Sequence, residues 1–420
     1  MAELGENKKL KVAIIGAGPA GLGAAIEFSK LPFVEFRIYE QARVLREIGT
    51  GISIQRNTWR MLDVMGAYNN IDPNGIFRAP DGYAVQHRRR DTPPRHLHAR
   101  ALRAVLQKAL LRQIDSSRLR LSSRLVQIIE KPSGELSLRF ADGHEDEVDL
   151  LVGADGVRSV VRSFAFPDHR ITFTGRVAYR ALVPSKGILA IPGFPDAVTF
   201  WHGPTDWVYT CNLNNGIYEI TTMVDEPPTS AQASWGQEAS LEEFKRPFKD
   251  FSPIVHKVLD LVKEVKKFPL FAGPRLSSVT ARWSIALVGD ASHPLSGAFG
   301  AGAGFALEDV YVLVQSVHWA HERGLSLADA LNLFDKVRSP HYEQMYLILD
   351  EFARSDAYVK ESRLGFDEAV AVTVANKWTE KHHWLYHYDV RNVWKEAYQA
   401  EDARRAAAGS RKETNLSSRL

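Results

Sequence analysis

The chain has almost no cysteine, since Cys211 is the only one among its 420 residues. One thiol cannot form an internal disulfide or supply a cysteine cluster for zinc, so a disulfide-stapled domain and a zinc finger are excluded. Long apolar runs are missing too, because no stretch approaches the roughly 18 residues that a membrane-spanning helix needs. We therefore expect a reducing compartment and no membrane span.

A large charge excess of either sign is also absent. Lys and Arg total 53 and Asp and Glu total 50, which leaves a net charge of +3. So small an excess does not build a basic face for a polyphosphate, and a nucleic-acid partner is disfavoured. His383 and His387 stand four residues apart, as two metal ligands on a helix would, but no HExxH glutamate or third ligand accompanies them. We therefore expect no metal site.

What the chain does contain is a glycine-rich motif between two predicted strands, within the composition of an ordinary globular protein. Residues 11–15 and 34–39 have strand character, and Gly16-Ala17-Gly18-Pro19-Ala20-Gly21 opens a helical segment between them. This pattern predicts a βαβ unit that binds a dinucleotide. Gly16 permits the tight turn, Gly18 lets the backbone approach a pyrophosphate, and Gly21 lets the helix pack on the strand.

Glu40 indicates which dinucleotide is bound. It stands 19 residues after Gly21, at the end of the second predicted strand. A carboxylate there accepts hydrogen bonds from an adenosine ribose and repels a 2′-phosphate. FAD or NAD is therefore favoured over NADP.

Two later clusters join glycines to an acid after an apolar strand. The first runs from Gly153 through Asp155 to Arg162, and the second is Gly289-Asp290-Ala291-Ser292-His293-Pro294, followed by Gly300-Ala301-Gly302. Because an unpaired buried carboxylate is costly, an acid in the position of Asp290 needs a partner. Glycines are required where a flat ring leaves no room for a Cβ.

The three motifs, in this order, resemble those of the single-component FAD-dependent aromatic hydroxylases, the group of p-hydroxybenzoate and salicylate hydroxylases. The similarity covers roughly residues 10–345, and the Gly-Ala-Gly-Ala-Gly run from Gly300 resembles the fungal salicylate-hydroxylase-like branch, which implies a place in secondary metabolism. The implied fold is α/β: a Rossmann-like FAD-binding domain of the p-hydroxybenzoate hydroxylase type, an inserted, mainly β substrate domain and a C-terminal helical segment. We assign the FAD-binding domain to residues 8–80, 95–167 and 270–340, the substrate domain to 168–269 with 81–94, the helical segment to 341–400, and a mobile tail to 401–420.

The resemblance also implies site residues. Gly51 lies in the family segment that passes near the flavin ring, Arg100 matches a helix start whose arginine reaches the FAD, and the counterpart of Asp290 accepts hydrogen bonds from the ribityl hydroxyls. His293 could be interpreted as a catalytic base, but a core position or a hydrogen bond that fixes its loop is the better interpretation. The implied FAD-binding residues are Gly16, Gly18, Ala20, Gly21, Glu40, Gly51, Arg100, Asp155, Asp290, Gly300, Ala301 and Gly302.

The substrate is expected on a sheet that roofs the flavin. Residues 176–183, 197–201, 207–213 and 217–224 read as strands bounded by turn residues. Arg180 lies on a segment that resembles the family strand entering this pocket, and Tyr209 occupies the family's place for a tyrosine that faces the ring. We predict that both hold a phenolate or acidic substrate, with ordinary sheet positions as the alternative. An arginine within reach lowers the pKa of a phenol and makes its ring more electron-rich.

The implied reaction is hydroxylation of an aromatic substrate with FAD, O₂ and a transient NADH or NADPH cosubstrate, through a flavin C4a-hydroperoxide. A flavin epoxidase of an indole or alkene is the alternative within enzymes, and a non-catalytic nucleotide-binding scaffold is the alternative of another class. One departure from the family is Gly297, which stands where a proline is common and leaves the identity of the substrate open.

The last three residues bear on location. Ser418-Arg419-Leu420 is one conservative step from the Ser-Lys-Leu tripeptide that the peroxisomal import receptor reads. The preceding residues are polar and basic, which favours an accessible end. We expect import into peroxisomes in a eukaryotic host, with the cytoplasm as the alternative.

Overall fold

The computed structural model describes residues 9–45, 51–78, 92–295, 297–379 and 384–417. The predicted import tripeptide 418–420, His383 and most of residues 81–94 lie outside these ranges. No helix in the described part of the chain has both the length and the apolar character needed to cross a membrane.

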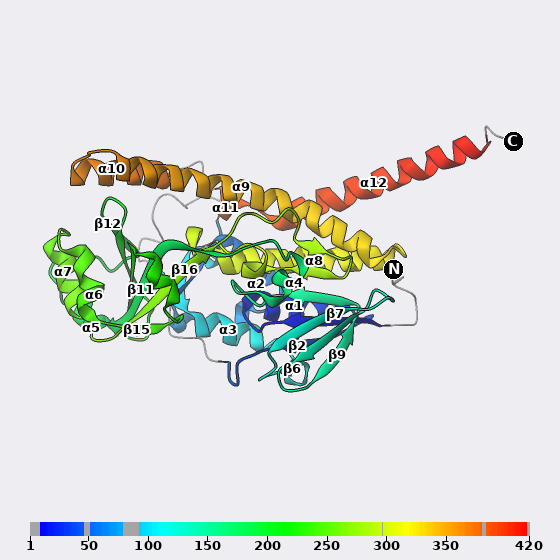
Figure 1. The fold of residues 1–420 in the computed structure, drawn as a ribbon, viewed down its shortest axis with the longest axis horizontal. Coiled ribbons are helices and arrows are strands. Elements are labelled where there is room, and N and C mark those ends of the chain that lie inside the picture. The colour runs from blue at the N-terminus through cyan, green and yellow to red at the C-terminus, as the bar shows by residue number, and fades with distance from the viewer. Residues whose placement is uncertain (1–8, 46–50, 79–91, 296, 380–383, 418–420) are drawn as a thin grey trace.

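A six-stranded sheet, built from residues 10–153 and 280–287, forms the centre of one of the two main parts of the molecule (Figure 1). Its strand order is β17-β18-β10-β1-β2-β6, and all neighbours are parallel except β17 and β18. Apolar side chains of this sheet form one large core with helices α1, α3 and α8. The α/β fold with a βαβ start is thus confirmed. The strands are β1 (Leu10–Ile15), β2 (Val34–Tyr39), β6 (Leu119–Arg120), β10 (Leu150–Gly153), β17 (Thr280–Ala281) and β18 (Ile285–Leu287), and the helices are α1 (Pro19–Phe28), α3 (Arg103–Leu111) and α8 (Gly302–Glu322).

Two small antiparallel sheets flank this unit. One has the order β3-β5-β4 and contributes Ile54, Ile76, Ala99 and Ala101 to the large core. The other is the meander β7-β8-β9, which packs with Tyr39 on the opposite side. Their elements, with two short helices, are β3 (Gly51–Ile54), α2 (Arg56–Val64), β4 (Ile76–Phe77), β5 (Ala99–Leu102), β7 (Leu125–Glu130), β8 (Leu136–Phe140), β9 (Glu145–Val148) and α4 (Val160–Ala165).

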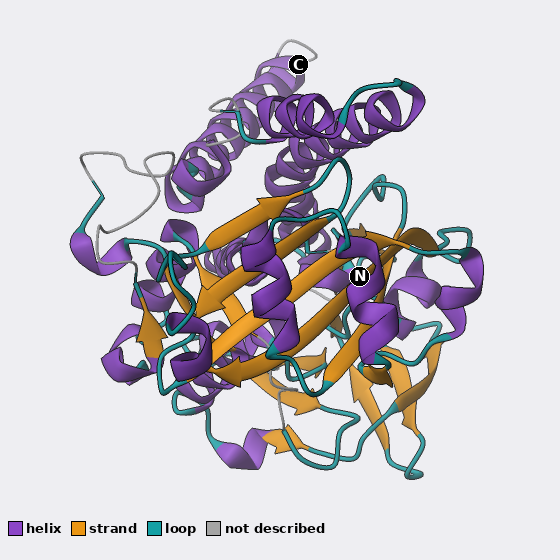
Figure 2. Ribbon diagram, turned by 90° about the vertical axis from the view of Figure 1, so that its left-hand side faces the viewer, coloured by secondary structure: helices purple, strands orange, loops and turns teal. Residues whose placement is uncertain are grey.

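A second six-stranded sheet, of order β12-β13-β14-β11-β16-β15, is built from residues 172–272. Short helices cover one face of it (Figure 2). On that face Tyr179, Val208 and Ile220 are fully buried among helix residues. Since side chains alternate along a strand, Arg180, Tyr209 and Glu219 point to the other face. The elements are β11 (Thr172–Pro184), α5 (Ser185–Leu189), β12 (Thr199–His202), β13 (Trp207–Asn212), β14 (Ile217–Asp225), β15 (Gln237–Ala239), α6 (Leu241–Lys245), α7 (Pro253–Asp260) and β16 (Val265–Ala272).

The C-terminal helices lie across the top of the molecule in Figure 1. They are α9 (Leu327–Glu361), α10 (Phe366–Lys377), α11 (Trp384–His387) and α12 (Val390–Ser417). Helix α9 packs on α8 at one end, while α10 reaches the second sheet, where the Thr373 hydroxyl donates to the carbonyl of Pro204 at 2.7 Å. The helical segment therefore joins the two large sheets.

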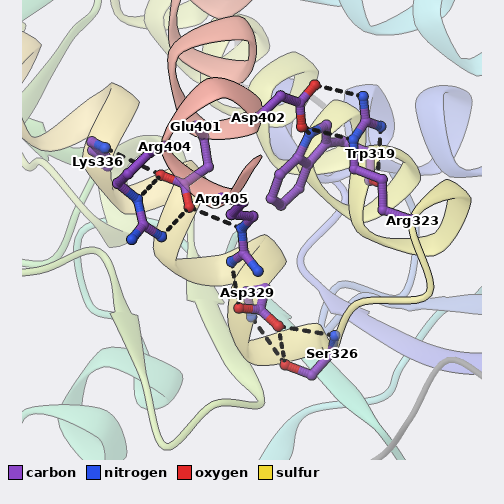
Figure 3. Close-up of polar contacts among 9 residues, drawn as sticks. All are labelled: Trp319, Arg323, Ser326, Asp329, Lys336, Glu401, Asp402, Arg404 and Arg405. Atoms are coloured by element: carbon purple, nitrogen blue, oxygen red, sulfur yellow. Dashed lines mark hydrogen bonds and ion pairs between the residues drawn. The ribbon is translucent and has the colours of Figure 1, made fainter. Parts of the chain in front are cut away.

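Residues 401–417, which the sequence assigned to a tail, continue helix α12. Figure 3 shows the contacts of the middle of this helix. The Asp402 carboxylate accepts hydrogen bonds from Trp319 Nε1 at 3.0 Å and from Arg323 Nε at 2.8 Å, and Arg405 donates to Asp329 at 2.6 Å. The polar composition that suggested disorder instead forms ion pairs with α8 and α9, and an alanine run favours the helix itself.

Candidate functional site

The glycine-rich turn between β1 and α1 is tight on one side and open on the other. Gly16 has a φ of +102°, and a Cβ there would collide with the carbonyl of Ala154, while a Cβ at Gly21 would collide with the carbonyl of Gly16. At Gly18 no described atom lies within 4 Å of the position that a Cβ would take. Gly18 is also the N-cap of α1 and supplies no side-chain cap, so the helix N-terminus is open to an anionic group.

Glu40 closes this turn from the end of β2. Its carboxylate accepts hydrogen bonds from the N–H groups of Ala17 and Ala42, each at 2.8 Å. The acid is therefore fixed directly beside the glycine-rich backbone, as a ribose-binding carboxylate must be.

Asp155 uses both of its oxygens on the chain itself. They accept from the Ser159 hydroxyl at 2.5 Å and from the N–H groups of Val160 and Val161 at 2.7 and 3.2 Å, so Asp155 satisfies the first two N–H groups of α4, whose N-cap is Ser159. Arg162 extends from α4 and donates to the carbonyl of Ala291 at 2.9 Å. In this structure the Asp155 motif therefore braces the turn that carries Asp290.

Asp290 lies in a short 3₁₀ turn, Gly289–Ala291, and its side chain is exposed. Its carboxylate makes no hydrogen bond to the part of the chain that the structure describes. The expectation that Asp290 needs a partner because it is buried was wrong, since only the strand before it is buried. The carboxylate instead faces outward and can accept hydrogen bonds from a ligand.

A buried charge cluster supports this turn from behind. Asp309 on α8 is fully buried and accepts from the N–H of Gly289 at 2.9 Å, from His293 Nε2 at 2.8 Å and from Arg338 Nε at 2.8 Å, and the Tyr342 hydroxyl donates to it as well. Burial would raise the pKa of Asp309, but Arg338 and the other donors hold it at about 2. The hydrogen bond of His293 confirms its interpretation as a residue that fixes the loop.

Arg100 lies on strand β5, and the helix start predicted for it is at Arg103 instead. Its register partners are Ser53 on β3 and Phe77 on β4, so these three side chains share the face of the small sheet that points away from the large core. Arg100 donates to the Ser53 hydroxyl at 2.7 Å and forms a buried ion pair with Glu219 of the second sheet. Arg100 thus joins the FAD-side sheet to the predicted substrate sheet.

The predicted substrate residues lie beside this ion pair. Arg180 on β11 and Tyr209 on β13 both pair with Thr221 on β14, so the three side chains form one row across the sheet. The Arg100 guanidinium lies 5.2 Å from the centre of the Tyr209 ring, and that of Arg180 lies 5.3 Å from the ring of Phe268. The structure therefore brings Arg180 and Tyr209 to one face, next to Arg100.

Two of the predicted flavin-side glycines border the same place. The N–H of Gly51 donates to Glu219 at 3.0 Å, and a Cβ at Gly51 would collide with the Glu219 carboxylate. Gly300 has a φ of +59°, and a Cβ there would lie 3.5 Å from the Ser53 hydroxyl. Ala301 is buried, while Gly302 begins α8 with open space around its Cβ position.

The charges at this place are set by burial and by the arginines. Burial raises the pKa of Tyr209 well above its ordinary value and that of Cys211 to about 12, so both are neutral. For Glu219 burial acts in the same direction, but the charges of Arg100 and Arg180 outweigh it and lower the pKa, so Glu219 is ionised.

Sequence reasoning missed several of these residues. Glu219 had a local signal, since it is an acid within the otherwise uncharged run 217–224. Arg162 ends the glycine-acid cluster that begins at Gly153, but its contact with Ala291 was not predicted. Arg338 had none, because its contact with Asp309 joins two helices across 29 residues.

Comparisons with known proteins show which proteins this chain is similar to. The family described as FAD binding domain matches residues 9–176. The FAD-dependent monooxygenase pigN of Monascus ruber is 32% identical over 342 residues, which cover 73% of this chain and 76% of that protein. The 3-amino-4-hydroxybenzoate 2-monooxygenase PtmB3 of Streptomyces platensis is 27% identical, over 81% of this chain and 87% of that protein. A solved structure of a salicylate hydroxylase substrate complex superposes with a TM-score of 0.72 at 20% identity, over 93% of this chain and 98% of that chain.

Proposed function

We propose a reaction for this chain, which belongs to the FAD-dependent monooxygenases: it uses NADH or NADPH and O₂ to hydroxylate a phenolic or salicylate-like aromatic substrate. The observation that carries the substrate assignment is the row of Arg180, Thr221 and Tyr209 beside the buried Arg100–Glu219 ion pair. It gives the Arg180 cation and an aromatic face in one place, between the small sheet and the second sheet.

The residues present fit FAD. The open side of Gly18 at the N-terminus of α1 suits the pyrophosphate, Glu40 suits the ribose and the exposed Asp290 carboxylate suits the ribityl hydroxyls. Gly300, with its positive φ, would let the backbone approach the flat ring. When bound, FAD supplies the electron transfer and the activation of O₂ that an aromatic side chain cannot.

The chain's own residues then act on the substrate. Arg180 favours an ionised phenol or carboxylate, because a nearby cation lowers the pKa of an acid in a partly desolvated place. Aromatic side chains surround Tyr209: the ring of Phe200 lies 4.8 Å from it, and those of Trp207 and Trp378 lie 5.4 and 4.9 Å from Phe200. These rings stack with a planar substrate and exclude water from it.

Two relatives support this substrate class by name, since one hydroxylates 3-amino-4-hydroxybenzoate and another is a salicylate hydroxylase of Pseudomonas putida. The cationic groups also favour an ionisable substrate over the neutral alkene of an epoxidase.

The test is a purified chain assayed in two stages. Mild denaturation should first release free FAD. The holoprotein should then oxidise NADH or NADPH faster with phenols or salicylates than with neutral indoles, and ¹⁸O₂ should label the product. A colourless protein that does not take up FAD, or a flavoprotein that no aromatic compound stimulates, would contradict the proposal.

A further inference from the structure

We propose that Glu219 is a specificity-determining residue: by pairing with Arg100 it keeps that guanidinium from binding the substrate, and so limits the negative charge that a substrate can carry. This inference rests on the proposed function and concerns the same site. It assigns separate tasks to two arginines, Arg100 and Arg180, on the sheet faces that meet at the Arg100–Glu219 ion pair.

The ion pair is part of the built structure. Glu219 is 2% exposed and Arg100 is 7% exposed. The Glu219 carboxylate also accepts from the N–H of Gly51 at 3.0 Å and from the Thr221 hydroxyl at 3.3 Å, while Arg100 donates to Ser53 at 2.7 Å. Partners from β3, β5 and β14 therefore hold both charges in one orientation.

Arg180 is placed differently. Its side chain is partly buried, and its buried Nε donates no hydrogen bond to the described part of the chain. Its guanidinium lies over the ring of Phe268, at the other end of the row from Tyr209. Arg180 could therefore donate hydrogen bonds, as a cation, to a planar anion bound between the two sheets.

The charge count gives the consequence. Arg100 and Glu219 form an ion pair, Tyr209 and Cys211 are neutral, and Arg180 remains as a cation. Burial lowers the pKa of Arg180, the charge of Glu219 raises it, and the charges of Arg103 and Arg100 lower it. Without the Glu219 charge, Arg100 would become a second cation facing the substrate. A substrate with two negative charges would then gain more than a substrate with one.

The test measures binding to the FAD-loaded protein through the change in its flavin absorption spectrum. Benzoate carries one charge, phthalate two and benzamide none. In Glu219→Gln the ratio of phthalate to benzoate affinity should rise roughly tenfold over wild type, as expected for one added charge in a partly solvated site. Benzamide affinity should stay within about twofold, since a neutral ligand does not sense the added charge.

Three further variants sharpen the result. Glu219→Gln/Arg100→Met removes both charges and should return the ratio to the wild-type value. Arg100→Met alone leaves Glu219 uncompensated and should lower the ratio, and it decides the question if Glu219→Gln does not retain FAD. Glu238→Gln removes the same charge from exposed strand β15 of the same sheet and should change nothing.

A ratio in Glu219→Gln equal to that of Glu238→Gln would overturn the inference, and so would a double variant that keeps the shifted ratio. If the FAD-loaded protein binds none of the three probes, the proposed function itself fails. If it binds them with a ratio that no variant changes, only the role of Glu219 fails.

Discussion

Replacing Arg338 by methionine should destabilise the protein strongly and weaken FAD binding, although α9 contributes no predicted FAD ligand. Arg338 and Asp309 are both 0% exposed and are joined at 2.8 Å. Removing one partner of a buried ion pair leaves the other charge unpaired and costs about 3–5 kcal/mol. Because Asp309 also holds the N–H of Gly289, its displacement would move the turn that presents Asp290.

The measurement is urea unfolding of the FAD-free and FAD-loaded protein by circular dichroism, together with FAD titration. Arg338→Met/Asp309→Asn should recover part of the lost stability, since Asp309 no longer leaves an unpaired charge, although Glu308, 3.5 Å from Arg338, still loses its partner. The matched control is Arg282→Met, which breaks an ion pair with Glu130 of similar length, 2.7 Å, at the surface. That variant should cost less than about 1 kcal/mol. If Arg338→Met cost no more than Arg282→Met, the cluster would not support the turn.

Four further predictions concern other parts of the molecule. Arg180→Ala and Tyr209→Phe should keep FAD but form less product and more H₂O₂ per NAD(P)H oxidised, because the substrate is misplaced; unchanged coupling in an oxygen-electrode assay would count against the pocket. Asp290→Ala should raise the Kd for FAD about tenfold, the loss of one or two hydrogen bonds, with an unaltered circular dichroism spectrum. Glu308 precedes Asp309 on α8 and lies 3.5 Å from Arg338. Burial raises its pKa to about 7 in the folded state, so stability should fall as the pH rises from about 4.5 to 7, and stability measured by urea unfolding should depend less on pH in Glu308→Gln across that window. A fluorescent protein fused to the N-terminus should enter peroxisomes only when Leu420 and the two residues before it are present, and diffuse fluorescence from both forms would reject that signal.

The parts of the fold that follow local spacing could be predicted from the sequence. The turn from Gly16 to Gly21 and the acid at Glu40 are close in the chain, and each has a steric or electrostatic reason that is independent of distant residues. The alternation that puts Arg180 and Tyr209 on one face is likewise local. Local spacing therefore predicts the turn that fits FAD and the face of the second sheet on which Arg180 and Tyr209 lie.

The remaining features depend on contacts between distant segments. The Arg100–Glu219 pair joins residues 119 positions apart and exists only because two sheets face each other. For Asp290 the buried strand before it suggested a buried carboxylate, but the turn that follows the strand exposes this side chain. Helix α12 is held to α8 by the ion pair between Asp402 and Arg323, and the composition of the segment does not predict that contact.

The grid formed by β11, β14 and β13 has a consequence for how this protein can diversify. Three rows of paired residues share the pocket-side face, while the residues between them pack against the short helices α5, α6 and α7. A library that varies this side of the sheet, with Glu219 kept because it holds Arg100 and the N–H of Gly51, would therefore explore new substrate ranges without disturbing the helix-packed core. Natural selection could also change the residues on this face, so that the substrate range changes while the helix-packed core stays the same. The nine positions on this face are Ala178, Arg180, Leu182, Trp207, Tyr209, Cys211, Glu219, Thr221 and Met223.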